Sequence, residues 1–327
     1  MKTKILEPTI DNINFCAKIL KSGGLVAFPT ETVYGLGGNA LDKEAVARIY
    51  EAKGRPKDNP MIVHIASHAV LESLVKGINH DGKLLMDTFW PGPLTIIFRA
   101  KSTVPKRATG GLSTVAVRMP ENEIALSLIE RAGVPIAAPS ANLSGRPSPT
   151  RVEHVVEDLD GRIDAILMGE ECKIGVESTV IDMSGSVPTI LRPGKITAEE
   201  IEKVIGLEVY TDDTILQEAK PDLRPGSPGM KYRHYAPKAP MIILKGKREN
   251  IEKEIEYRKA TFDGKLGIIL FDWDKPEEAA HDFYRALRKM DEERVDLILA
   301  GAVSTEGLGL AVMNRMLKSA AHQVLEV

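Results

Sequence analysis

The sequence predicts an α/β protein with two domains, and three observations predict this fold class. The 327 residues amount to about two domains of ordinary size. Before about residue 206, short apolar runs and helical segments follow one another in irregular order, which is typical of a twisted, mixed α/β sheet. After about residue 240, strand and helix alternate regularly, which is typical of a small Rossmann-like parallel sheet. We therefore expect a mixed-sheet domain over 1–206, a linker over 207–240 and a Rossmann-like domain over 241–327.

The elements of the first domain follow from apolar runs and from helix-end signals. Asp11 is predicted to cap a helix that Gly23-Gly24 ends. Thr197 and Glu200 form the capping box that opens another helix. The predicted helices are 12–21, 43–53, 122–132 and one that begins at 198. The predicted strands are 25–28, 61–65, 94–98, 114–117, 135–138, 178–181 and 189–191.

The second domain is predicted from a repeating strand–helix unit. Its predicted strands are 241–244, 266–271 and 295–299, and its predicted helices are 250–257, 276–289 and 308–320. The linker before it contains the prolines Pro221, Pro225, Pro228, Pro237 and Pro240. Prolines at this density favour an extended chain between two folded units.

Composition excludes several classes of protein. With 43% hydrophobic and 27% charged residues, the chain has no signature of disorder. Its 43 Lys and Arg residues against 46 Asp and Glu residues argue against a generally basic nucleic-acid-binding surface. Cys16 and Cys172 are too few for a disulfide scaffold and indicate a reducing compartment. Without a signal-peptide pattern or a long apolar run, we expect a cytoplasmic protein that does not contact membranes.

Acidic residues are absent from three long stretches. They are missing between Asp87 and Glu121, from Arg131 to Val152, and from Leu223 to Arg248. Loop composition alone explains any one such stretch, but three of them favour a surface that receives an anionic ligand.

Polar loops that follow predicted strands are the candidate ligand-binding segments. The segment 29–37 combines hydroxyl groups with glycines, 53–60 carries three cations, and 138–150 is rich in serine and proline. Taken singly, each is equally consistent with an ordinary turn or a solvated helix end. No phosphate-binding G-x-x-x-x-G-K-[ST] motif and no G-x-G-x-x-G motif occurs. His64 and His68 have the spacing of a zinc pair, but His64 lies in a predicted strand, so we expect no protein metal site.

The order of these motifs resembles a known family. Lys53-x-Arg55 followed by Ser140-x-Asn142 is similar to the signature of YrdC-type threonylcarbamoyl-adenylate synthases. The further segments that resemble this family are 29–35, 91–95, 177–179 and 192–194. The segment 227–237 resembles the linker of the long, two-domain members. The resemblance is strong over about residues 10–205 and rests on position more than on motif in the C-terminal domain.

The resemblance implies a reaction and its participants. ATP, L-threonine and bicarbonate would form L-threonylcarbamoyl-adenylate with release of pyrophosphate, and Mg²⁺ would enter with the ATP phosphates rather than through side-chain ligands. A separate tRNA threonylcarbamoyl transferase complex would use the product to modify the adenosine next to the anticodon. Such chemistry needs charge neutralisation and positioning more than a protein nucleophile.

The resemblance also implies roles for particular residues. The catalytic residues would be Lys53, Arg55, Ser140 and Asn142. The ATP-binding residues would be Lys53, Arg55, Asn59, Thr114, Ser140, Ser148, Arg192, His234 and Tyr235. The threonine-binding residues would be Thr32, His64, Arg118, Ala138 and Ser178, with the fork of Arg118 suited to the amino-acid carboxylate.

The linker segment 227–237 is predicted to act as a lid. It contains Lys231, Arg233, His234 and Tyr235 and no acidic residue, whereas a passive spacer has no need of aromatic side chains. We expect His234 and Tyr235 to reach the nucleotide and to shield a labile mixed anhydride from water. A basic linker that only tethers the two domains is the alternative.

Two other functions remain open from the sequence. One is an RNA-binding, translation-associated module without catalysis, against which the net charge of −3 counts, although a local basic patch could bind RNA weakly. The other is a carbamoyltransferase of hydrogenase maturation, which forms a carbamoyl-adenylate. Those proteins carry zinc-finger and acylphosphatase modules, for which this chain has neither the cysteines nor the length.

Overall fold

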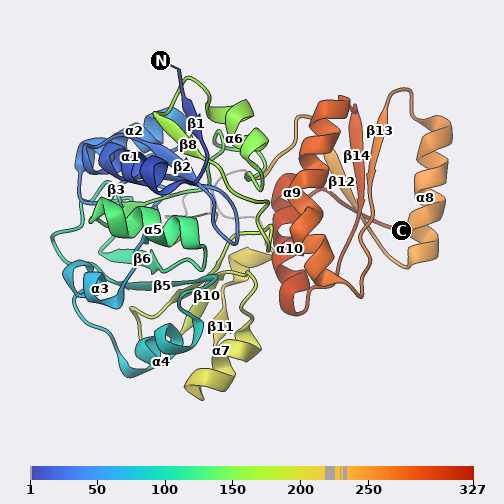
Figure 1. Cartoon of the computed structure of the whole chain (residues 1–327). Helices are drawn as coiled ribbons and strands as arrows, with labels where there is room; N and C mark the ends of the chain where they lie inside the picture. The colour runs from blue at the N-terminus through green and yellow to red at the C-terminus, as the bar shows by residue number, and fades with distance from the viewer. Residues whose placement is uncertain (1, 218–224, 229, 231–233) are drawn as a thin grey trace.

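The computed structural model describes residues 2–217, 225–228, 230 and 234–327. Two domains lie side by side in Figure 1, a larger one on the left and a smaller one on the right. The larger domain is built on an eleven-stranded sheet and the smaller one on a four-stranded sheet. The predicted fold class is therefore confirmed.

The larger sheet has the strand order β1-β8-β2-β3-β7-β4-β6-β5-β9-β10-β11. Its strands are β1 (Lys4–Leu6), β2 (Val26–Phe28), β3 (Gly35–Asn39), β4 (Ile62–His64), β5 (Leu94–Arg99), β6 (Thr114–Arg118), β7 (Ile136–Ala137), β8 (Ala165–Leu167), β9 (Thr179–Asp182), β10 (Thr189–Arg192) and β11 (Tyr210–Thr211). β4 pairs in parallel with β6, whereas β5 pairs antiparallel with β6 and β3 antiparallel with β2. The sheet is therefore mixed, as the irregular order of elements predicts.

Seven α-helices accompany this sheet in the described part of the chain. They are α1 (Ile10–Lys21), α2 (Lys43–Lys53), α3 (His68–Leu74), α4 (His80–Phe89), α5 (Glu123–Ala132), α6 (Val152–Leu159) and α7 (Ala198–Ile205). The capping box of Thr197 and Glu200 is formed at α7, as predicted. The predicted cap of α1 is wrong, because Thr9 accepts the backbone N–H of Asn12 and places Asp11 in the first turn. Both residue types cap helices well, so the local sequence did not decide between them.

The segment 29–37, predicted as a loop, contains the start of a strand. β3 pairs with both β2 and β7, so it lies inside the sheet. A Cβ atom at Gly37 would come within 2.8 Å of the Phe28 ring and 2.9 Å of Ile136. Gly37 is thus required by close packing, although glycine in a sequence more often indicates a turn.

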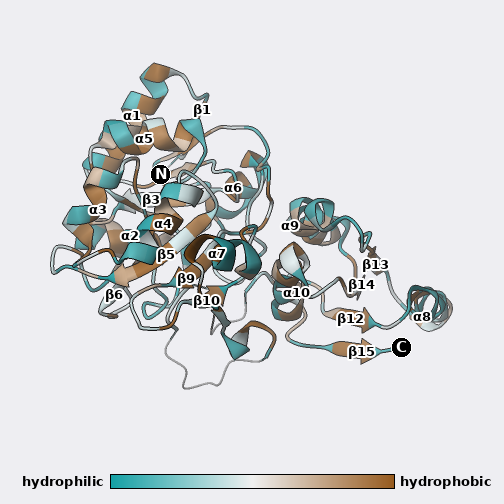
Figure 2. Ribbon diagram, turned by 90° about the horizontal axis from the view of Figure 1, so that it is seen from below, coloured by the Kyte–Doolittle hydropathy of each residue, from teal (hydrophilic) through white to brown (hydrophobic). Residues whose placement is uncertain are grey.

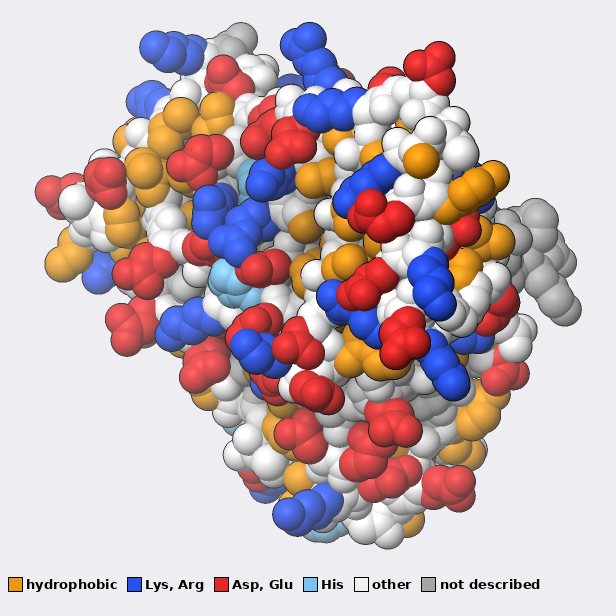
Figure 3. All heavy atoms as spheres, turned by 90° about the vertical axis from the view of Figure 1, so that its right-hand side faces the viewer, with side chains coloured by type: hydrophobic (Ala, Val, Ile, Leu, Met, Phe, Trp, Pro, Cys, Tyr) orange, Lys and Arg blue, Asp and Glu red, His pale blue; other side chains and the backbone are white. Residues whose placement is uncertain are grey.

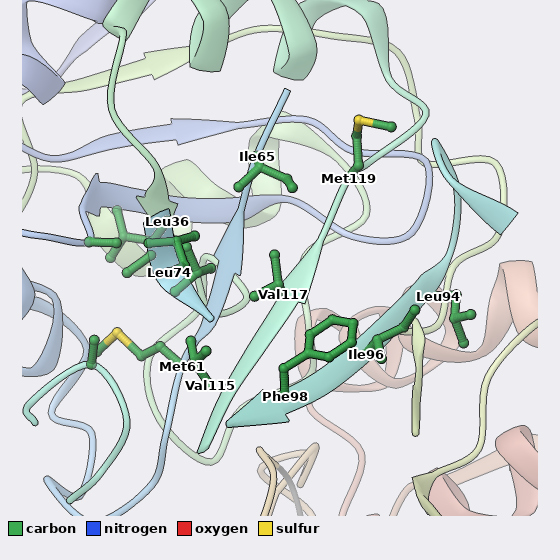
Figure 4. Packing of buried hydrophobic residues seen from close by; sticks show 14 of the residues in the cluster. Leu36, Met61, Ile65, Leu74, Leu94, Ile96, Phe98, Val115, Val117 and Met119 are labelled. Carbon is green, nitrogen blue, oxygen red and sulfur yellow. The ribbon is translucent and has the colours of Figure 1, made fainter. Parts of the chain in front are cut away.

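The core of the larger domain lies between its sheet and the covering helices. Figure 4 shows Leu94, Ile96 and Phe98 of β5 beside Val115 and Val117 of β6. All five side chains are buried. Burial of each such side chain stabilises the fold by about 1.5–3 kcal/mol, so the central strands hold the loops at their ends rigidly.

The smaller domain is a parallel sheet in the order β13-β14-β12-β15, which confirms its predicted Rossmann-like form. Its elements are β12 (Met241–Lys245), α8 (Arg248–Thr261), β13 (Leu266–Ile269), α9 (Pro276–Glu293), β14 (Leu297–Gly301), α10 (Gly307–Ser319) and β15 (Val324–Glu326). α9 and α10 face the larger domain, and α8 lies on the far side of the sheet (Figure 1). Figure 2 shows α8 mostly in hydrophilic colours, in keeping with its few buried residues, Ile251 and Ile255.

The predicted linker does not begin as a free connector. β11 lies within 207–240 and pairs in parallel with β10, and a short 3-10 helix, Asp213–Ile215, follows it. Lys231 and Arg233 of the predicted lid lie outside the described residues.

None of the described helices is long and apolar enough to cross a membrane.

Candidate active site

A cavity that opens to solvent lies where several strands of the larger sheet end. His64 ends β4, Arg118 ends β6 and Arg192 ends β10. Lys53 ends α2, and the loops after β7 and before β9 complete the wall. Ligands of α/β sheets commonly bind at the carboxyl ends of strands. The fold thus gathers residues from distant parts of the sequence at one place.

Most of the predicted site residues line this cavity. They are Thr32, Lys53, Arg55, His64, Arg118, Ala138, Ser140, Asn142, Ser178, Arg192, His234 and Tyr235. Asn59, Thr114 and Ser148 do not line it. Asn59 is buried behind Arg55, and Thr114 is the partly buried first residue of β6, opposite Arg99 of β5. Ser148 is fully buried and donates to Glu177, a residue of the cavity wall.

Lys53 connects α2 to the loop after β7. Its ammonium group donates to the backbone carbonyls of Ser140 and Asn142, and its Nζ lies 3.4 Å from Asn142 Oδ1. The carbonyl of Lys53 in turn accepts the backbone N–H of Ser144. Burial and the nearby Arg55 hold the pKa of Lys53 well below its usual value. Lys53 therefore shapes this loop and places its amino group beneath it.

Arg55 is held in one orientation by a turn that follows α2. Its Nη2 donates to Asn59 Oδ1 at 2.7 Å and to the carbonyl of Pro60 at 2.8 Å. The side chain is buried, and burial lowers its pKa to about 10, so it remains a cation at neutral pH. Asn59 thus acts on the cavity through Arg55.

Arg118 enters the opposite wall of the cavity from the end of β6. Its Nη2 lies 2.6 Å from Glu31 Oε1, its Nη1 donates to Thr32 Oγ1 at 2.9 Å, and its Nε donates to the carbonyl of Gly92 at 3.2 Å. A guanidinium group has five N–H donors. Two of these contacts, from Nε and Nη1, are hydrogen bonds, whereas the Nη2–Glu31 contact is an ion pair without a hydrogen bond, so N–H groups of Nη1 and Nη2 remain for a ligand.

Two histidines of the cavity are neutral at physiological pH. Burial and the positive charge of Arg118 lower the pKa of His64 to about 3. Burial and Arg55 lower the pKa of His234 to about 3. Both imidazoles can donate and accept hydrogen bonds, but neither is basic enough to remove a proton efficiently at pH 7.

A carboxylate that sequence reasoning did not single out lies among these groups. Glu177 precedes Ser178, and it accepts hydrogen bonds from Ser148, from Tyr284 of α9 and from Arg315 of α10. Arg192 donates to the carbonyl and the hydroxyl of Ser178, at 3.1 Å each. The second domain therefore contacts the wall of the cavity. The only hint in the sequence was Arg315, an arginine within the apolar run of α10. The sequence does not show that its partner is Glu177.

Neither a cluster of metal-ligating side chains nor a reactive thiol is found in the described part of the chain. No group of three or more His, Cys, Asp or Glu side chains suited to a metal occurs among the described residues. Burial raises the pKa of Cys172 to about 12 and that of Cys16 to about 11, so both thiols are protonated and poor nucleophiles. The cavity combines arginine side chains with neutral hydroxyl, amide and imidazole groups, and it includes the Glu177 carboxylate in its wall. Such a set is suited to binding anions and to catalysis by positioning and charge.

Comparisons with known proteins agree with this class. The family model described as "Telomere recombination", for Sua5, YciO and YrdC proteins, matches residues 18–194, and the model for the C-terminal domain of threonylcarbamoyl-AMP synthase matches 196–321. The threonylcarbamoyl-AMP synthases of Pyrococcus abyssi and Bacillus subtilis are 50% and 48% identical, over 96% and 94% of this chain and 96% and 93% of theirs. A structure of P. abyssi Sua5 complexed with L-threonine has a TM-score of 0.94 at 48% identity, covering 100% of both chains. The chain therefore belongs to the Sua5/YrdC family of threonylcarbamoyl-AMP synthases and is an enzyme.

Proposed function

We propose that the cavity binds L-threonine, bicarbonate and ATP and forms threonylcarbamoyl-AMP with release of pyrophosphate. One observation carries this proposal: a single cavity holds two separate sets of cations. Arg118 lies on one wall with Thr32, and Lys53 and Arg55 lie on another with Ser140. The reaction joins two anionic molecules, an amino acid and a nucleotide, and so requires both sets.

The bonds of the proposed reaction balance without a protein nucleophile. The amine of threonine forms a C–N bond to the carbon of bicarbonate, one C–O bond breaks, and water leaves. Of the two protons that the ammonium group loses, one ends in that water and the other passes to solvent. An oxygen of the resulting carbamate then forms a P–O bond to the α-phosphorus of ATP, and the bond to pyrophosphate breaks.

We place threonine beside Arg118. The N–H groups of this guanidinium that make no hydrogen bond to the protein suit a carboxylate, and the neutral His64, Ala138 and Ser178 line the same cavity. Because the pKa of His64 is about 3, His64 orients the substrate by hydrogen bonds rather than acting as a base.

We place ATP over Lys53, Arg55 and Arg192. Positive groups there would neutralise the charge that develops on the phosphates, which is commonly a large part of catalysis. Mg²⁺ would enter bound to the ATP phosphates, with Ser140 and Asn142 offering neutral oxygens nearby. Asn59 and Ser148 would act by holding Arg55 and the loop after β7.

We also propose that the segment 234–236 covers the nucleotide. His234 and Tyr235 line the cavity, and the backbone N–H of Ala236 donates to the carbonyl of Gly145 at 2.7 Å. The second domain holds the other side, because Ser319 Oγ donates to the carbonyl of Tyr235 at 2.9 Å. A cover attached to both domains would exclude water from the mixed anhydride.

The product would pass to a separate tRNA threonylcarbamoyl transferase in the cytoplasm. RNA binding by the face in Figure 3 would be weak at most, since acidic and basic side chains are interspersed over it. A tRNA gel shift over a range of salt concentrations would measure it.

The decisive experiment is pyrophosphate release from ATP by the full chain, with one component omitted at a time. Release should require threonine, bicarbonate and Mg²⁺ together, and threonylcarbamoyl-AMP should accumulate in the complete mixture. Equal release without threonine would overturn the proposal.

A further inference from the structure

We infer that Glu177 is a positioning residue for the nucleotide end of the cavity and that Tyr284 and Arg315 of the second domain hold it in place. This inference rests on the proposed function, because it assigns the second domain a part in ATP binding. It concerns residues that do not touch the reacting atoms but fix those that do.

The contacts of Glu177 come from three separate elements. Tyr284 Oη donates to its two carboxylate oxygens, at 3.0 and 2.9 Å. Ser148 Oγ donates to Oε1 at 2.6 Å, and Arg315 Nε donates to Oε2 at 3.1 Å. Both oxygens are therefore engaged, and two of the three donors belong to α9 and α10.

Arg315 reaches two loops of the cavity wall at once. Besides Glu177, its Nη1 donates to the carbonyl of Pro193 at 2.6 Å. Pro193 follows Arg192, and Glu177 precedes Ser178. One fully buried side chain of the second domain thus fixes the neighbours of two residues that line the cavity.

A second arginine, Arg288 of α9, holds a third loop, the one that carries Ser148. Arg288 Nη2 donates to the carbonyl of Pro147 at 2.6 Å and to Asp158 Oδ2 at 2.9 Å. Pro147 directly precedes Ser148, so the loop that carries Ser148 is fixed at its backbone and at its hydroxyl. Tyr284, Arg288 and Arg315 are each at most 1% exposed, so these contacts lie in a dry interface.

The arrangement depends on charge as well as on shape. A buried carboxylate is costly unless it is paired and hydrogen-bonded. The charge of Arg315 lowers the pKa of Glu177 against the opposing effect of burial. Glu177 therefore keeps its position only while the second domain supplies its partners, which gives that domain a function beyond attachment.

Tyr284→Phe is the most direct test, because it removes one hydroxyl group and leaves the ring in place. We expect the KM for ATP to rise about tenfold and the KM for threonine to rise by a smaller factor, because Glu177 also adjoins Ser178 of the threonine pocket. A purely structural role would reduce the fraction of active enzyme, lowering kcat with both KM values unchanged. That pattern, or an unchanged KM for ATP, would overturn the inference.

A double variant and a conservative replacement test whether Tyr284 and Arg315 act on ATP binding through Glu177. If Tyr284 acts through Glu177 on Ser148, the double variant Tyr284→Phe/Ser148→Ala should have the same KM for ATP as Ser148→Ala alone, within twofold. Independent, multiplicative effects would contradict this route. Arg315→Lys should recover part of the ATP affinity lost in Arg315→Met, since it restores a positive group opposite Glu177.

Tyr257→Phe is the matched control. Tyr257 is an exposed tyrosine of α8 in the same domain, so this variant should keep the wild-type KM values. Calorimetric binding of a non-hydrolysable ATP analogue provides a readout that does not need turnover. A wild-type chain that binds the analogue but releases no threonine-dependent pyrophosphate would overturn the proposed reaction, while the comparison with Tyr284→Phe would still decide the inference.

Discussion

Arg118 and Glu31 form an ion pair inside the wall of the cavity, with Arg118 Nη2 2.6 Å from Glu31 Oε1. Both side chains are about 95% buried, at 4% and 5% exposure. Removing one member of such a pair leaves the other charge without compensation and costs about 3–5 kcal/mol. Glu31 therefore fixes the guanidinium that we propose to bind the carboxylate of threonine.

The pair allows binding to be separated from stability. Arg118→Met should weaken threonine binding far more than ATP binding and should also lower the free energy of unfolding. Arg118→Met/Glu31→Gln should regain much of that stability, because neither charge is left alone, yet it should not regain threonine binding. Calorimetric titration with each ligand and urea unfolding measure both effects. A selective loss of ATP affinity in Arg118→Met would contradict the assignment.

Arg55→Ala should reduce the rate of pyrophosphate release by about 10²–10³, the usual scale for losing one electrostatic stabiliser. A solvated cation, the alternative that the sequence leaves open for 53–60, would contribute at most about 1 kcal/mol to stability, but the structure does not place Arg55 in solvent. Arg55 is buried and bonded to Asn59 and Pro60, so its loss should also cost about 1–3 kcal/mol. Steady-state kinetics and urea unfolding are the measurements.

Arg107→Ala is the control for Arg55. Its side chain is 54% exposed and pairs with the exposed Glu44 at 3.5 Å. An exposed pair contributes about 0–1 kcal/mol, so both activity and stability should stay near the wild type. Wild-type turnover in Arg55→Ala would show instead that the turn after α2 has no part in catalysis.

The sequence predicted the residues that line the cavity better than the residues of the second domain that hold its wall. Lys53 and Arg118 lie where motif order and strand ends placed them. The bonds from Arg315 and Tyr284 to Glu177 span 138 and 107 positions in the chain. Local patterns show that an arginine in an apolar helix needs a buried partner, but packing of the domains decides which one. β3 was missed for a related reason, because its glycines serve contacts with distant strands.

Tyr235→Ala should separate pyrophosphate release from accumulation of the product. The tyrosine lines the cavity and packs against Tyr284, with ring centroids 5.3 Å apart. Without this cover, water would reach the mixed anhydride, and the ratio of threonylcarbamoyl-AMP to released pyrophosphate should fall about tenfold. Chromatography of the nucleotides measures the ratio. Tyr257→Ala on α8 is the control, and an unchanged ratio in Tyr235→Ala would favour a linker that only tethers the domains.

Stability should fall steeply below pH 6.5 because three histidines are buried in neutral form. Burial is the main cause that lowers the pKa of His64 and His234 to about 3 and that of His154 to about 4. In the unfolded chain the same groups take up protons near pH 6.5. Between about pH 6.5 and 4 the unfolded state binds more protons, so the free energy of unfolding decreases as pH falls. Above pH 7 all three are neutral in both states and contribute nothing to the pH dependence.

Each of these histidines should add about 1.4 kcal/mol per pH unit to the slope of stability against pH. His154→Gln is the sharpest test, because His154 lies in α6, outside the cavity, and accepts the backbone N–H of Thr150 at 3.2 Å. A glutamine can keep that bond, and it does not titrate. Urea unfolding at pH 7, 6 and 5 should give similar stabilities for variant and wild type at pH 7. It should also give a slope that is shallower in the variant, by about 1 kcal/mol per unit on average over this range, since the limit of about 1.4 is reached only well below pH 6.5. Parallel slopes would show that His154 is protonated in the folded protein.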